Sequence, residues 1–84
     1  MSYRIEILPA AVKEYRRVPD THREAVKKAI LGLEHNPRGF QVKKLQGREF
    51  YRLRVGDWRV IFAISDPRKL VTIIVVERRT SVAY

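Results

Sequence analysis

Alternating apolar and polar residues dominate the second half of the chain and predict a β-hairpin over residues 51–62. The alternation continues on both sides of Gly56-Asp57, and glycine at the first loop position suits a two-residue type II′ turn. A loop of two residues determines which residues of the two strands are paired. We therefore expect Val55 to face Trp58 and Arg54 to face Arg59. One face of the hairpin is then apolar, and it comprises Tyr51, Leu53, Val55, Trp58, Val60 and Phe62.

The other face of the predicted hairpin carries Arg52, Arg54 and Arg59. Two arginines directly opposite each other on a ladder repel, and this repulsion weakens the strand pair. We interpret the cluster as a site for an anion, and phosphate is the natural candidate because it accepts paired guanidinium hydrogen bonds.

The first half of the chain predicts one short strand and two helices. Residues 3–7 alternate as a strand with one buried face. Pro9 suits the first position of a helix that continues to about residue 18, since proline needs no hydrogen-bonded N–H there. Thr21 and Glu24 have the spacing of a capping box, which predicts a second helix from residue 21.

The second helix is expected to end before Asn36-Pro37, because a residue preceding proline avoids the α region. Residues 36–48 are predicted to be irregular. The whole chain, residues 1–84, is predicted to be one α+β domain of order β-α-α-β-β-β. Its antiparallel sheet would carry the helical hairpin on its apolar face.

A last strand is predicted over residues 70–77, which are almost continuously apolar and β-branched. A four-residue loop, 66–69, would pair Ser65 with Leu70 and Val60 with Val75. By alternation, Arg78 would then lie on the face of Arg54 and Arg59. The same face would leave four apolar residues partly exposed: Ile61, Ala63, Ile74 and Val76.

Charge points to a polyanionic partner. The chain of 84 residues has a net charge of +9, a balance most often associated with nucleic acid. The alternative is a basic surface that only promotes solubility. There is no cysteine and no apolar run of the roughly 18 residues that cross a membrane, and the N-terminus has no signal-peptide pattern.

Common catalytic motifs are missing from the sequence. It contains no glycine-rich phosphate loop, no HExxH and no cysteine nucleophile. His22 and His35 fall at the two ends of the second predicted helix. Glu77 alternates onto the apolar side of the last strand and is interpreted as a strand-end residue.

The remaining candidates for chemistry are four arginines and one tyrosine: Arg52, Arg54, Arg59, Arg78 and Tyr84. Arginines stabilise phosphate charge but stay protonated, so they are not ordinary bases. Neighbouring arginines would lower the phenol pKa of Tyr84 from about 10. Tyr84 could instead stack on a nucleobase, or be a frayed terminal residue.

Three segments, 44–47 (KLQG), 51–62 (YRLRVGDWRVIF) and 77–79 (ERR), followed by Tyr84, resemble the RelE/ParE toxin superfamily of toxin–antitoxin modules. The resemblance extends over essentially the whole chain. Trp58 stands where the family usually has tyrosine, a change that preserves a core role.

The resemblance implies two possible activities. RelE-type members are ribosome-dependent, metal-independent endoribonucleases that cut mRNA in the ribosomal A site, and ParE-type members poison DNA gyrase. For a RelE-type chain it implies that Arg59 and Arg52 bind and stabilise the scissile phosphate. Arg52 and Arg54 match a pair of basic sheet residues that are often lysines in the family. It implies that Arg78 stabilises the leaving 5′ oxygen and that Tyr84 orients or deprotonates the 2′-OH. Further RNA contacts are expected from the neighbouring cations Lys43, Lys44, Arg48 and Arg79.

The leading hypothesis is therefore a cytoplasmic mRNA interferase that needs no cofactor or metal. Its expected partners are a cognate antitoxin, in a toxin–antitoxin complex of higher order, and mRNA on the ribosome, with no membrane. The alternatives are a ParE-like gyrase poison and a non-catalytic basic RNA-binding domain.

Overall fold

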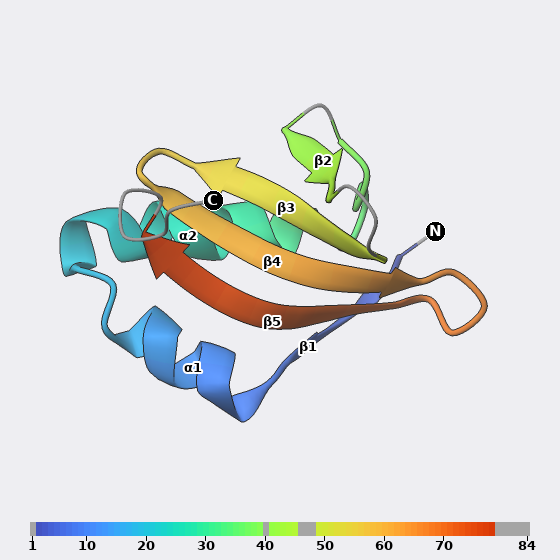
Figure 1. Cartoon of the computed structure of the whole chain (residues 1–84), viewed down its shortest axis with the longest axis horizontal. Helices are drawn as coiled ribbons and strands as arrows, with labels where there is room; N and C mark the ends of the chain where they lie inside the picture. Colours follow the sequence, from blue (N-terminus) through green and yellow to red (C-terminus); the bar gives the residue numbers. More distant parts are fainter. Residues whose placement is uncertain (1, 40, 46–48, 79–84) are drawn as a thin grey trace.

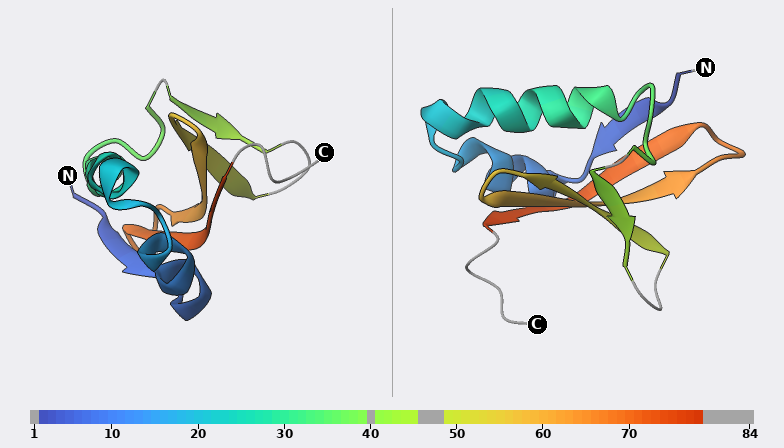
Figure 2. Two further views of the ribbon diagram at one scale, coloured as in Figure 1. Left: turned by 90° about the vertical axis from the view of Figure 1, so that its left-hand side faces the viewer. Right: turned by 90° about the horizontal axis from the view of Figure 1, so that it is seen from above.

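The computed structural model describes residues 2–39, 41–45 and 49–78 of the chain. A five-stranded sheet forms the centre, in the spatial order β1-β5-β4-β3-β2. Its strands are β1 (Arg4–Ile7), β2 (Val42–Lys44), β3 (Phe50–Val55), β4 (Trp58–Ser65) and β5 (Leu70–Arg78). Both helices, α1 (Pro9–Arg16) and α2 (Asp20–Gly32), cover the same face of the sheet (Figures 1 and 2). The predicted α+β class with a helical hairpin on one face is confirmed.

The first strand departs from the predicted all-antiparallel sheet. β1 pairs with β5 in parallel, with Ile5 opposite Val71 and Ile7 opposite Ile73. The two helices carry the chain across one face of the sheet before it returns as β2 at the opposite edge (Figure 1). A strand that begins such a crossover can add to the sheet in parallel, which alternation within residues 3–7 does not reveal.

The helices begin where prolines set the backbone. Pro9 is the first residue of α1, as predicted. Pro19 is the N-cap of α2 with an extended backbone (ψ 146°), so α2 starts at Asp20 rather than at Thr21. The predicted capping box is therefore wrong: Thr21 lies inside the first turn, and no side chain caps this end.

A short strand was not predicted within residues 36–48. β2 pairs antiparallel with β3, with Val42 opposite Leu53 and Lys43 opposite Arg52. Three residues, two of them lysines, give too little alternation to predict a strand, although charged residues are common on edge strands.

The β3–β4 hairpin has the predicted register, including Val55 opposite Trp58 and Arg54 opposite Arg59. Gly56 has φ +57°, and Asp57 is not among the residues with positive φ, as a type II′ turn requires. The turn predicted between β4 and β5 also holds, since Ser65 pairs with Leu70.

The β4–β5 ladder contains a bulge that the sequence did not predict. Phe62 pairs with Ile73, but Ile61 already pairs with Val75, so Ile74 is the extra residue on β5. Beyond the bulge Val60 pairs with Val76, not with Val75. Every residue of β5 after Ile74 therefore points to the face opposite the one predicted.

The hydrophobic core lies between the helices and the apolar face of the sheet. Phe62, Ile73 and Val60 are fully buried at its centre, and Tyr51 stacks on Phe62 with the ring centroids 5.8 Å apart. The helices and the residues that follow them contribute Ala11, Val18, Val26, Ile30 and Leu33 to this core. Val76, predicted to be partly exposed on the other face, belongs to this core because of the bulge. The core thus leaves the opposite face of the sheet uncovered by helices.

Candidate nucleic-acid interface

Cationic side chains gather on the face of the sheet that the helices leave uncovered. We call Lys43, Arg52, Arg54 and Arg59 the arginine face. Lys43 pairs with Arg52, and Arg54 pairs with Arg59, so each pair shares one side of its ladder. Lys43 and Arg54 are exposed and Arg52 is half-buried. Cations at this spacing suit the phosphates of a nucleic-acid backbone.

Arg59 has a different environment from the other cations. Only 5% of its surface is exposed, and among the residues that the structure describes it is the only charged residue that is buried. Its Nε donates a hydrogen bond to Oε2 of Glu77 over 3.0 Å, and Glu77 is its partner on β5. The carboxylate offsets one charge of the opposed Arg54 and Arg59, and so reduces the repulsion expected from the sequence.

Glu77 is the residue of this face that sequence reasoning missed. Regular alternation from Leu70 places it on the apolar side, and only the bulge at Ile74 turns it towards Arg59. The sequence carries no glycine or proline that would indicate a bulge within residues 70–78.

Arg78 does not lie on the arginine face, so its predicted position is wrong. It pairs with Trp58, and its guanidinium lies over the Trp58 ring, 5.8 Å from the centroid. The reason is the same bulge, which reverses the direction of each side chain after Ile74.

The flanking lysines are divided between the two faces. Lys43 joins the arginine face, whereas Lys44 pairs with Tyr51 and therefore points to the helix side of the sheet. Arg48, Arg79 and Tyr84 lie outside the described residues.

Apolar residues accompany the cations, but fewer are exposed than predicted. Ile61 is 8% exposed and counts as buried, while Ala63 and Ile74 are partly exposed. Val75 lies on this face opposite Ile61, in the position that the predicted register gave to Ile74.

A second group of charges lies at the far end of the β4–β5 hairpin. Arg38 holds Asp66 through two hydrogen bonds, of 3.1 and 2.9 Å, and the hydroxyl of Tyr3 donates a third over 2.7 Å. The Arg38 guanidinium, followed by the Tyr3 hydroxyl, lowers the pKa of Asp66 below its usual 3.8. In return, the hydrogen bond to Asp66 raises the pKa of Tyr3 above 10.0. This group ties β1, the segment after α2 and the β4–β5 turn together, and it is remote from Arg59.

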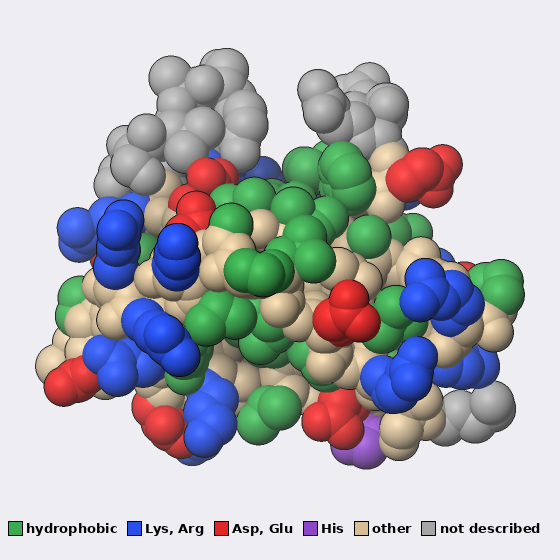
Figure 3. Space-filling model, turned by 90° about the horizontal axis from the view of Figure 1, so that it is seen from below, with side chains coloured by type: hydrophobic (Ala, Val, Ile, Leu, Met, Phe, Trp, Pro, Cys, Tyr) green, Lys and Arg blue, Asp and Glu red, His purple; other side chains and the backbone are tan. Residues whose placement is uncertain are grey.

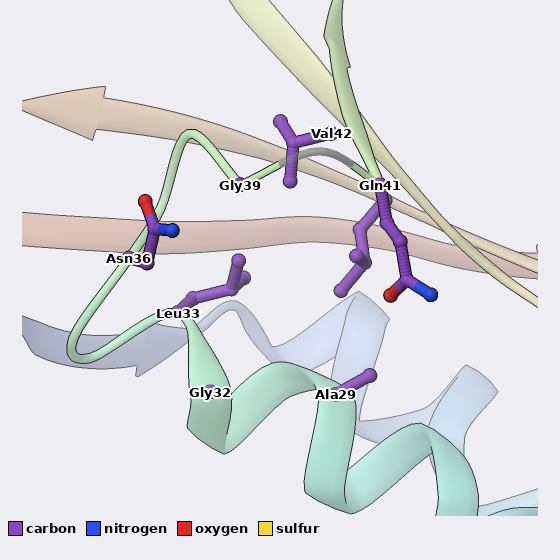
Figure 4. Close-up of a pocket in the computed structure, with 8 residues that line it drawn as sticks. Ala29, Gly32, Leu33, Asn36, Gly39, Gln41 and Val42 are labelled. Carbon is purple, nitrogen blue, oxygen red and sulfur yellow. The ribbon is translucent and has the colours of Figure 1, made fainter.

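Two hollows lie away from the arginine face. One, of about 220 Å³, is lined by residues of α2, β2 and the segment between them, such as Ala29, Leu33 and Val42, and none of its lining residues ionises (Figure 4). The other, of about 300 Å³, lies between β1 and α2 and is lined mostly by apolar side chains, including Ile7 and Leu31. Figure 3 shows hydrophobic side chains across the middle of the side formed by β1, α1 and β5, with Lys and Arg towards both ends. Tyr15 and Lys27 also line the second hollow, but neither hollow includes a residue of the arginine face.

Two further observations concern the described part of the chain only. It contains no cluster of three or more His, Cys, Asp or Glu that could hold a metal ion. Within the same residues, no helix is both long and apolar enough to cross a membrane.

Comparison with known proteins identifies the family. The family model described as the ParE toxin of the type II toxin–antitoxin system parDE matches residues 5–82. This chain belongs to the RelE/ParE toxin superfamily. Among its relatives, the mRNA interferase toxin RelE of Escherichia coli K12 is 30% identical over 82 residues, covering 94% of this chain and 85% of RelE.

Solved structures of RelE toxins share the fold of this RelE/ParE-family chain. The toxin of the archaeal RelE–RelB complex from Pyrococcus horikoshii OT3 superposes with a TM-score of 0.82 at 31% identity, over 98% of this chain and 100% of that one. The intact E. coli RelBE toxin–antitoxin complex matches with a TM-score of 0.78 at 29% identity, over 92% and 96% of the two chains. The resemblance expected from segments 44–47, 51–62 and 77–79 is confirmed.

Proposed function

We propose that this chain is the toxin of a type II toxin–antitoxin module and that it cuts mRNA on the ribosome. The observation that carries the proposal is the arginine face, where the fold brings four cations together on a surface left free by the helices. The relative named mRNA interferase toxin RelE supports the same reaction. Because ribosomes are its place of action, we place the protein in the cytoplasm.

The proposed reaction is an internal transesterification of RNA. The ribose 2′-OH attacks the adjacent phosphorus and loses its proton, and the bond to the 5′ oxygen of the next nucleotide breaks. The products are a 2′,3′-cyclic phosphate and a 5′-OH, which takes up a proton. Arg52 and Arg54 contact the phosphate. Arg59, shielded from water, stabilises the negative charge of the pentavalent phosphate, because charges interact more strongly where water is excluded.

Two further roles in this reaction are assigned to Tyr84 and Arg78. Tyr84 orients or deprotonates the 2′-OH. Arg78 would serve the leaving oxygen only after its side chain leaves Trp58 and swings around the end of β5. Of the flanking cations, Lys43 is well placed for RNA, whereas Lys44 points to the other side of the sheet. RNA contacts by Arg48 and Arg79 remain part of the proposal.

A protein antitoxin is the proposed partner. The similar structures from P. horikoshii and E. coli are toxin–antitoxin complexes. The net charge of +9 suits an acidic segment, and the hollow beside Ile7 and Leu31 suits its apolar side chains. We propose that such an antitoxin forms a complex of higher order with this chain.

A gyrase poison is the second candidate function, because the matching family model is described by the ParE toxin. The two candidates differ in what happens to RNA. The test is to induce the chain without its antitoxin and to map the 5′ ends of cellular mRNA. Cuts in phase with codons are expected. Intact transcripts with trapped gyrase–DNA complexes would instead show that the chain acts as a ParE-type toxin.

Two pairs of variants connect the growth arrest to the site. Arg59→Ala and Tyr84→Phe are expected to relieve the arrest, and arrest at the wild-type level in both would refute the catalytic assignment. Lys43→Ala should weaken toxicity more than its neighbour Lys44→Ala, which is the matched control on the opposite face. Equal effects at 43 and 44 would mean that the arginine face is not the RNA surface.

A further inference from the structure

A carboxylate lies within the cationic cluster, and neither the family resemblance nor the proposed mechanism gives it a role. Glu77 faces Arg59 across the β4–β5 ladder, and its Oε2 lies 3.0 Å from Arg59 Nε. The Arg59 side chain is 6% exposed and that of Glu77 is 22% exposed. The pair is thus largely shielded from water, but the carboxylate remains accessible from the surface.

The contact restrains the guanidinium in a specific way. An arginine side chain has many rotamers, and a planar guanidinium acts on a phosphate only in a narrow range of orientations. A hydrogen bond to Nε restrains the guanidinium plane along the edge next to the side-chain stem. Burial strengthens this bond, since water competes less for the charged groups.

The bulge at Ile74 is what creates the contact. A regular ladder would turn Glu77 towards the helices and would place an apolar side chain beside Arg59. Bulges often re-aim a side chain at a functional site. Here the re-aimed residue meets the one buried cation of the arginine face among the described residues.

We propose that Glu77 is a positioning residue that holds Arg59 in the orientation needed to stabilise the phosphate in the transition state. This inference rests on the proposed endoribonuclease function. Glu77 acts through Arg59, and the distance between its carboxylate and Nε matters more than its charge.

Two conservative substitutions separate the effect of side-chain length from the effect of charge at position 77. Glu77→Gln keeps the length of the side chain and an acceptor oxygen for Nε–H, but it removes the charge. Glu77→Asp keeps the charge, but it withdraws the carboxylate by one methylene. Glu6→Gln, on the exposed part of β1, is the control because it changes the net charge by the same amount as Glu77→Gln.

The assay is single-turnover cleavage of mRNA on programmed ribosomes, followed over a range of toxin concentrations. The maximal rate and the half-saturating concentration are obtained separately for each variant, at equal amounts of folded protein measured by circular dichroism. We expect Glu77→Asp to lower the maximal rate roughly tenfold or more, since misplacing a catalytic group by about 1 Å can cost about 100-fold. Glu77→Gln should stay within about threefold of the wild type, and neither variant should raise the half-saturating concentration.

Other outcomes overturn the inference. A rate for Glu77→Gln as low as that of Glu77→Asp, or lower, would make the carboxylate itself essential, as for a general base. Faster cleavage or tighter binding in Glu77→Gln than in Glu6→Gln would make Glu77 an inhibitory counter-charge that the phosphate displaces. A wild-type cleavage rate in Glu77→Asp would show that the length of this side chain does not matter for positioning Arg59. A wild-type protein that does not cut mRNA would instead refute the proposed function itself.

Discussion

Replacing Arg54 by glutamine should stabilise the fold and weaken RNA binding. Arg54 and Arg59 are directly opposed on the β3–β4 ladder, and Arg54 is exposed at the surface. Removing one of two like charges relieves their repulsion, and glutamine keeps much of the side-chain length. The same change removes a cation from the arginine face.

The expected gain in stability is small but measurable. Like charges directly opposite on a ladder cost about 0.2–1 kcal/mol, and Glu77 on the other side of Arg59 offsets part of this repulsion. A gain of about 0.5 kcal/mol in the free energy of unfolding corresponds to a rise in melting temperature of about 2–4 °C for a domain of this size. The gain should shrink at high salt, which screens the exposed charge.

Thermal denaturation followed by circular dichroism, at low and high salt, measures the first effect. Fluorescence anisotropy with a labelled single-stranded RNA measures the second, and the salt dependence of log Kd should fall by about 0.7 for one lost phosphate contact. The matched control is Arg4→Gln, which removes one charge from exposed β1 at a position opposite Leu70. A melting temperature for Arg54→Gln no higher than that of this control, together with unchanged RNA affinity, would refute the reasoning.

Two further predictions concern stability. Glu14→Ala should lower the free energy of unfolding by about 1–3 kcal/mol, because Glu14 Oε1 accepts a 2.9 Å hydrogen bond from the partly buried backbone N–H of Val76. Glu14→Gln keeps an acceptor oxygen, so urea denaturation should show a clearly smaller loss of unfolding free energy than for Glu14→Ala. Equal losses in the two variants would contradict the role of Glu14 as a hydrogen-bond acceptor. Asp66→Asn should lower the melting temperature at neutral pH, where the carboxylate is ionised and held by Arg38. Because the pKa of Asp66 is lowered in the folded state, the difference from the wild type should disappear as the pH falls through and below 3.8, and a difference independent of pH would argue against the ion pair.

Several elements of the fold could be predicted from the sequence because they depend on nearby residues. The two-residue loop at Gly56 determines which residues of β3 and β4 are paired, so the opposition of Arg54 and Arg59 was predicted correctly. Pro9 likewise determines where α1 starts, and the four-residue turn before Leu70 determines where β5 starts. Each of these features depends on a few neighbouring residues, whose types restrict the backbone directly.

Other features required contacts between distant segments. β1 is parallel to β5 because the helices carry the chain back across the sheet, and β2 is recognisable as a strand only through its pairing with β3. The capping box failed because Pro19 had already set the start of α2. Tyr84 lies outside the described residues, so its role stays a prediction.

The sequence by itself determined the hairpin and the arginines opposed across it, because a tight turn and side-chain alternation act over a few residues. Only the tertiary structure decided which charges of β5 join them. One extra residue at Ile74 places Glu77 against Arg59 and sends Arg78 to Trp58. Alternation has a period of two, so a single unpaired residue exchanges the two faces for the rest of the strand. Whether a ladder accommodates such a residue depends on packing across the whole sheet.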